Sequence, residues 1–207
     1  IYTLSLHDAL PIFGRASARA EHLELYSVDH SAAFLARVRA TGSSYMTNAL
    51  ARLNASWGGL CKEAKVAAAK VGMRPPEANP FRNNVAQAIE LVDALVRCAA
   101  LCRTLAADEF SGSSAPPARI EARAGRAVGF TEAPRGALFH ELELDGEGRM
   151  LRASIITPTA QNIANLEADM RLLAEALVAE GADEVEVRTQ VEKLVRAYDP
   201  CLSCSVH

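Results

Sequence analysis

The chain has 207 residues, of which 50% are hydrophobic and 23% are charged, so it is long enough to bury a core of ordinary globular composition. A formal net charge of -3 gives no basic field for nucleic acid or anionic membranes, and no apolar run reaches the ~20 residues of a membrane-spanning helix. Five cysteines without regular spacing are not the framework of a secreted disulfide protein, which favours a reducing, cytoplasmic compartment.

The first segment, IYTLSLHDALPI at residues 1–12, needs separate treatment. Its back-translation resembles a common sequencing-library adapter read in frame. We therefore interpret residues 1–12 as a translated artefact and exclude them from fold reasoning. On this hypothesis residues 13–207 are the C-terminal part of a larger domain whose N-terminal part is missing. Different codons in the nucleotide record would refute it.

The next segments alternate between extended, helical and breaking patterns. Residues 22–40, HLELYSVDHSAAFLARVRA, predict a short extended piece followed by a helix. Residues 60–72 are alanine-rich and predict a helix that ends at Gly72, and RPPEANP at residues 74–80 breaks the chain.

Residues 81–106 form the longest periodic segment and predict a long buried helix. Its apolar stripe at helical spacing consists of Val85, Ile89, Val92, Val96 and Ala99. Cys98 and Cys102 lie beside this stripe, and we interpret them as packing residues because a free cysteine behaves as a small hydrophobe. SGSSAPPAR at residues 111–119 predicts a loop.

The C-terminal half predicts a hairpin followed by two helices. Residues 137–159 hold two strand-like runs around the turn sequence DGEGR. A helix over residues 160–181 stops at Gly181, and Asp183 with Glu186 suits a capping box for the next helix. The expected fold class is mainly α with a small antiparallel β-sheet, that is, α+β.

The tail, DPCLSCSVH, places Cys201 and Cys204 two residues apart, a spacing that lets both sulfurs reach one metal or a metal pair. Thiolates select soft or borderline metals such as nickel and iron. A redox pair, half a zinc site and chance remain alternatives, and the chain offers no second CxxC to complete a zinc site.

Three ordered motifs then resemble one family. DPCLSCSVH resembles the C-terminal DPCxxCxxH motif of [NiFe]-hydrogenase large subunits, EAPRG at residues 132–136 resembles their arginine-bearing loop, and PTAQN at residues 158–162 resembles their Pro-Thr/Ser loop. Weaker similarity covers SYMTNALARLN and NPFRNNVAQAIELVDAL, so the resemblance extends over residues 31–207. It implies the helical-bundle core of that large subunit.

The resemblance assigns roles to matched positions only. Cys201 would be a terminal nickel ligand, and Cys204 would bridge nickel and iron. Arg135 would place its guanidinium over the metals, donate to a cyanide on iron and act as an electrostatic group or base, with Asp199 holding it in place. The alternative for Arg135 is a structural ion pair.

Further roles concern the surroundings of the metals. Thr159 would donate its hydroxyl to a second cyanide, or cap a helix, or both. Pro134 and Pro158 would be apolar walls. His207 would bind a magnesium or iron ion that ties the tail into the core, and the backbone carbonyl of Ile155 would join that ion.

The implied reaction is reversible heterolytic cleavage of H2 at a Ni–Fe centre with CO and CN ligands on iron, with electrons passed to a small iron–sulfur subunit. The form of the motifs looks like the cytoplasmic bidirectional branch, whose partner subunits reduce NAD(P) or a deazaflavin. The family's second CxxC and its proton-transferring glutamate are absent from this chain, so the isolated polypeptide is expected to be inactive.

Two readings compete with hydrogenase. A non-catalytic relative, such as the quinone-linked subunit of respiratory complex I, shares the fold but lacks the cysteines, so the retention of Cys201, Cys204 and Arg135 argues against it. A helical protein with a zinc or redox CxxC tail is the other. Metal analysis would separate them, since nickel and iron in equal amounts favour hydrogenase and zinc favours the tail alternative.

Overall fold

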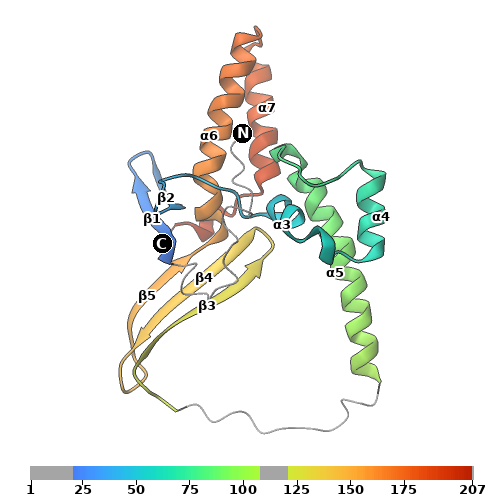
Figure 1. Ribbon diagram of the computed structural model, residues 1–207. Coiled ribbons are helices and arrows are strands. Elements are labelled where there is room, and N and C mark those ends of the chain that lie inside the picture. Colours follow the sequence, from blue (N-terminus) through green and yellow to red (C-terminus); the bar gives the residue numbers. More distant parts are fainter. Residues whose placement is uncertain (1–20, 108–120, 207) are drawn as a thin grey trace.

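The computed structural model describes residues 21–107 and 121–206, which form an α+β fold (Figure 1). This confirms the expected class, although the described residues contain two antiparallel sheets where one was expected. Residues 1–12, the predicted loop at residues 111–119 and His207 lie outside the described residues.

A hairpin of β1 (Leu23–Val28) and β2 (Ser31–Val38) opens the described chain. The prediction of a helix in this region was wrong, because SAAFLARV forms β2. Its local helix propensity is overridden by burial: Leu35 is 1% exposed and packs with Ile163 of the long helix behind the hairpin.

Three helices follow and build the main hydrophobic core: α3 (Ala49–Ser56), α4 (Lys62–Lys70) and α5 (Asn83–Ala106), with short 3-10 turns η1 (Trp57–Gly59) and η2 (Pro80–Arg82) between them. Both α3 and α4 pack on α5. Gly72 ends the alanine-rich segment with a φ of +63°, as expected.

Only the first part of α5 is buried. The predicted helix is confirmed, but its burial was overestimated: Ile89 is 3% exposed, whereas Leu95 and Leu101 are each 61% exposed. Cys98 and Cys102 are exposed too, so their interpretation as packing residues was wrong. The physical reason is that the neighbouring helices of the described chain cover the N-terminal turns of α5, and its far end projects from them (Figure 1).

A second sheet has the strand order β3 (Gly125–Ala133), β4 (Gly136–Leu144), β5 (Met150–Ile156), all antiparallel. The hairpin β4–β5 was predicted, but β3 was not. Phe139 and Ile156 are paired on neighbouring strands and pack with Tyr45, which fixes the sheet against the rest of the chain.

Two antiparallel helices, α6 (Pro158–Ala179) and α7 (Glu184–Tyr198), run side by side and lead into the tail with its 3-10 turn η4 (Leu202–Cys204) (Figure 1). Gly181 adopts a φ of +86° between them. Asp183 caps α7, with its Oδ1 accepting from the Glu186 N–H at 2.8 Å, as the capping pattern predicted.

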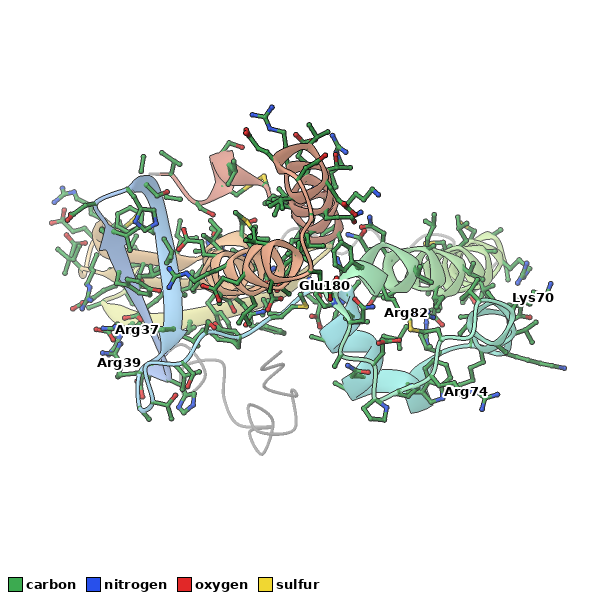
Figure 2. The ribbon with its side chains drawn as sticks, turned by 90° about the horizontal axis from the view of Figure 1, so that it is seen from above. Arg37, Arg39, Lys70, Arg74, Arg82 and Glu180 are labelled. Carbon is green, nitrogen blue, oxygen red and sulfur yellow. A yellow bond between two sulfur atoms is a disulfide. The ribbon has the colours of Figure 1, made fainter. Side chains whose placement is uncertain are left out.

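The fold therefore has two neighbouring parts, as Figure 2 shows from above: the β1–β2 hairpin with Arg37 and Arg39 at one end, and α4 with Lys70 and Arg74 at the other. The start of α6 and the end of α7 lie between them. Among the described residues, no helix is both long and apolar enough to cross a membrane.

Candidate functional site

The β3–β4 turn carries Arg135. Ala133 pairs with Gly136 in the sheet, so Pro134 and Arg135 form a two-residue connection between the strands. Gly136 has a φ of +131°, and a Cβ built on it would lie 2.0 Å from the carbonyl oxygen of Thr47. Glycine is therefore needed here both for its backbone conformation and for the close approach of the segment before α3.

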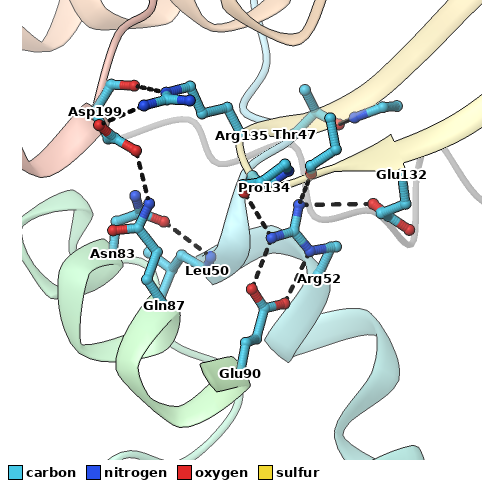
Figure 3. A network of polar contacts seen from close by, with 12 residues as sticks. Thr47, Leu50, Arg52, Asn83, Gln87, Glu90, Glu132, Pro134, Arg135 and Asp199 are labelled. Atoms are coloured by element: carbon cyan, nitrogen blue, oxygen red, sulfur yellow. Dashed lines mark hydrogen bonds and ion pairs between the residues drawn. The ribbon is translucent and has the colours of Figure 1, made fainter. Parts of the chain in front are cut away.

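The Arg135 side chain reaches the start of the tail and binds one residue there twice (Figure 3). Its Nε donates to the Asp199 backbone oxygen at 2.6 Å, and its Nη2 donates to Asp199 Oδ1 at 3.1 Å. The other carboxylate oxygen, Oδ2, accepts from Gln87 Nε2 of α5 at 3.1 Å. The structure thus shows the ion pair that was expected between Arg135 and Asp199.

Asp199 is also the point at which α7 ends. It has a φ of +51°, the only positive φ of a non-glycine residue in the described chain. Aspartate tolerates this left-handed conformation better than most residues. Because the conformation turns the chain sharply before Pro200, it directs the tail from α7 back across the start of α6.

Thr159 holds the next residue of the tail. Its Oγ1 accepts from the Cys201 backbone N–H at 3.3 Å, and its side chain is almost fully buried. The N-cap of α6 is Thr157, whose Oγ1 accepts from the Ala160 N–H at 3.2 Å, so the helix-cap alternative for Thr159 is wrong. A hydroxyl that accepts one hydrogen bond still has its own hydrogen to donate.

The two tail cysteines face each other. The Cys204 N–H donates to the Cys201 carbonyl at 2.9 Å within η4, the Cα atoms are 5.4 Å apart, and the two sulfurs form a disulfide. In its reduced form the same loop presents two thiolates that reach one ion, which fits the donor chemistry of a nickel or iron site. No cluster of three or more potential metal-ligating side chains occurs within residues 21–107 and 121–206, so a metal bound by this pair would need further ligands.

The tail beyond Cys204 is tied to the hairpin. The Phe34 N–H of β2 donates to the Ser205 carbonyl at 2.8 Å, and Ser205 is fully buried. His207 follows outside the described residues, so its role as an ion ligand stays a prediction.

The remaining predicted positions are Pro158, Pro134 and Ile155. Pro158 is buried in the first turn of α6, and Pro134 stands in the β3–β4 turn. Ile155 pairs with His140 in the sheet and is 38% exposed. That its backbone carbonyl binds an ion also stays a prediction.

Sequence reasoning missed polar residues that hold the site together. Asn162 donates from Nδ2 to the Arg135 carbonyl at 3.0 Å and accepts at Oδ1 from the Thr47 N–H at 2.8 Å. Gln87, which binds Asp199, and the buried Asn83 belong to α5. Asn83 and Gln87 stand at i and i+4 and so share one face of α5, but this spacing alone does not indicate their partners.

The end of α7 is anchored by a buried polar group. The Tyr198 hydroxyl donates to Asp169 Oδ2 at 2.5 Å and accepts from Asn165 Nδ2 at 2.6 Å. Burial and the bond to Asp169 raise the pKa of Tyr198 well above its usual range. This tyrosine stays neutral at physiological pH and fixes α7 to α6 directly before the tail.

Comparison with known proteins adds the family. A sequence model of the family described as nickel-dependent hydrogenase matches residues 60–207. The chain is 41% identical over 129 residues to the alpha subunit of sulfhydrogenase 1 from Pyrococcus furiosus, a stretch of 62% of this chain and 29% of that relative. It is 37% identical over 84 residues to the beta subunit of the NAD-reducing hydrogenase HoxS from Cupriavidus necator, over 40% of this chain and 17% of the relative.

A third relative belongs to an F420-non-reducing hydrogenase of Methanothermobacter marburgensis and is 36% identical over 110 residues, which are 51% of this chain and 23% of the relative. The matched stretches therefore span less than a third of the length of these curated relatives.

Solved structures share the fold. A NAD+-reducing [NiFe]-hydrogenase in the H2-reduced state superimposes with a TM-score of 0.67 at 23% identity, over 93% of this chain and 43% of that one. The reduced Ni-Fe-Se hydrogenase from D. vulgaris Hildenborough gives a TM-score of 0.53 at 21% identity, over 86% and 38% of the two chains.

Proposed function

We propose, from the premise that the chain belongs to the nickel-dependent hydrogenase family, that it forms the C-terminal part of the catalytic subunit of a [NiFe]-hydrogenase. In this proposal Cys201 and Cys204 supply two of the thiolates of the metal centre, and residues outside this chain supply the others. The reaction is the reversible heterolytic cleavage of H2.

One observation carries the proposal. Arg135 and Thr159, which come from two different motifs, bind Asp199 and Cys201 on either side of Pro200. The three motifs that resemble the family therefore meet at one place, although more than 60 residues separate the first from the last.

The residues of this chain suit the reaction. Arg135 uses two of its five N–H groups on Asp199, which leaves others that could donate to a bound group, and its positive charge is permanent. Asp199 fixes the guanidinium in one orientation, and Thr159 holds the backbone of the loop that presents the sulfurs. A bound Ni–Fe centre supplies the Lewis acidity that activates H2.

Finer parts of the proposal concern ligands, ions and partner subunits that are not part of this chain. They are CO and CN ligands on iron, a magnesium or iron ion at His207 and the Ile155 carbonyl, a small iron–sulfur subunit, and partner subunits that reduce a nicotinamide or deazaflavin. The NAD-reducing relative supports the nicotinamide alternative. A cytoplasmic location also stays a proposal, since Cys61, Cys98 and Cys102 are free whereas Cys201 and Cys204 form a disulfide.

Metal analysis of the complete large subunit, purified with its small subunit, tests the proposal. We expect about one nickel per large subunit and H2-dependent dye reduction. Replacing Cys201 or Cys204 with serine should remove both, while Cys98→Ser, a change of an exposed cysteine on α5, should remove neither. Zinc in place of nickel, or nickel retained in both tail variants, would show that the proposal is wrong.

A further inference from the structure

A second arginine, Arg52 of α3, binds the backbone of the β3–β4 turn (Figure 3). Its Nη1 donates to the Ala133 carbonyl at 3.1 Å, and its Nη2 donates to the Pro134 carbonyl at 2.8 Å. These are the two backbone carbonyls that directly precede Arg135. The guanidinium of Arg52 therefore fixes the position of the turn relative to α3.

Arg52 is itself held by a bidentate partner on another helix. Its Nε and Nη2 donate to Glu90 Oε1 and Oε2 of α5 at 2.8 and 2.7 Å. The two side chains are only 16% and 26% exposed, so water screens this pair less than a surface ion pair. Glu132 adds a longer contact at 3.7 Å. A lysine cannot reproduce this fork, because it is a point charge without planar geometry.

The next carbonyl of the turn is held from the other side. Asn162 of α6 donates to the Arg135 carbonyl at 3.0 Å. Three successive carbonyls, those of residues 133 to 135, thus accept from side chains that stand on helices. The turn cannot shift by an ångström without breaking a charged hydrogen bond, and the Arg135 guanidinium moves with it.

We propose that Arg52, oriented by Glu90, is a positioning residue that sets where Arg135 stands above the tail. The inference rests on the proposed function, because it gives Arg135 a place beside the metal ligands. Arg52 acts through the backbone of the turn. Its loss should therefore lower the turnover number and leave the KM for H2 unchanged.

The decisive experiment is hydrogen–deuterium exchange on the complete enzyme and its Arg52→Lys variant. Loss of two charge-assisted hydrogen bonds should raise exchange of the amides in residues 133–137 by about tenfold. The turnover number should fall by about tenfold as well, with nickel content unchanged. The matched control is Arg126→Lys, which changes an arginine paired with Glu141 at 2.7 Å on the same strands but far from the turn.

Equal exchange in Arg52→Lys and the Arg126→Lys control would overturn the proposal, as would a tenfold higher KM with an unchanged turnover number. If Arg52→Lys does not fold, Glu90→Gln decides, because it removes the charge but leaves a side chain of the same shape. It should raise exchange in residues 133–137 and leave exchange in α5 unchanged. A wild-type enzyme without nickel would refute the proposed function alone, since the exchange comparison still tests the position of the turn.

Discussion

Gly136→Ala is the substitution for which the structure predicts the largest local cost. The residue has a φ of +131°, a region that is essentially restricted to glycine, so an alanine there costs about 1–3 kcal/mol in backbone strain. The added Cβ would also lie 2.0 Å from the Thr47 carbonyl oxygen and 2.5 Å from the Thr47 Cγ2. Neither the strand nor the backbone before α3 can absorb that overlap by a rotamer change.

The turn and Thr47 must therefore separate, and two hydrogen bonds are lost when they do. The Ala137 N–H donates to Thr47 Oγ1 at 3.2 Å, and the Thr47 N–H donates to Asn162 Oδ1 at 2.8 Å. At about 1 kcal/mol each, they bring the expected loss of unfolding free energy to about 3–5 kcal/mol.

Urea unfolding measures this loss, and Gly181→Ala is the control. Gly181 has a comparable positive φ of +86°, but no atom lies within 4 Å of the position that its Cβ would take. It should cost only about 1 kcal/mol, because backbone conformation alone is at stake. Equal losses for the two variants would refute the reasoning, since they would show that contact with Thr47 does not constrain the turn.

Three further predictions concern the supports of the tail. The pKa of Tyr198 is raised in the folded chain, so the unfolded chain loses this proton first. The free energy of unfolding should therefore be constant to about pH 10 and fall above it. Urea unfolding at about pH 9–12 should show that Tyr198→Phe reduces the slope of this free energy against pH by about 1.4 kcal/mol per pH unit. Asp183→Ala should cost about 1 kcal/mol through the lost cap of α7, and an equally stable variant would contradict the cap. Asn83→Ala should cost about 3 kcal/mol by thermal unfolding, because it leaves the Leu50 N–H and the Ala197 carbonyl unpaired, whereas a loss below that of Asp183→Ala would contradict this assignment.

The sequence predicted the elements whose local signals agree with their environment. α7 has a strong cap at Asp183 and Gly181 separates it from α6, so the approximate ranges and the order of both helices could be read directly, although the cap of α6 is Thr157 and not Thr159. The hairpin β1–β2 could not, because SAAFLARV has the composition of a helix and becomes a strand only where it pairs with β1 and packs on α6. β3 was missed for another reason, since GRAVGFTEA has few apolar residues and none of them is fully buried.

The candidate site was predicted at the level of motifs and not at the level of contacts. The pairing of Arg135 with Asp199 followed from the resemblance, and the structure contains it. The residues that hold the pair in place, Gln87 and Asn162, carry no motif that would reveal a contact across the fold. Their partners are backbone groups or residues far away in the sequence, so only the packing of the helices brings them together.

The first turns of α5 explain how the tail keeps its position within the described residues. Asn83, Gln87 and Glu90 occur at i, i+4 and i+7, so they lie on one face of the helix. Asn83 binds the last turn of α7. Gln87 binds Asp199 and Glu90 binds Arg52, as Figure 3 shows. Each contact joins a different segment of the site to the same rigid helix.

Such an arrangement fixes the sulfur-bearing loop before any metal is bound. Asp199 is held by Arg135 and by α5, Cys201 is held by Thr159, and Ser205 is held by the strand β2. Because these four contacts come from four different elements, losing one leaves the loop attached at the others. In the proposed function, reduction of the Cys201–Cys204 disulfide would therefore present both thiolates on a loop whose conformational entropy has already been lost, which would favour metal binding without a large rearrangement of this part of the chain.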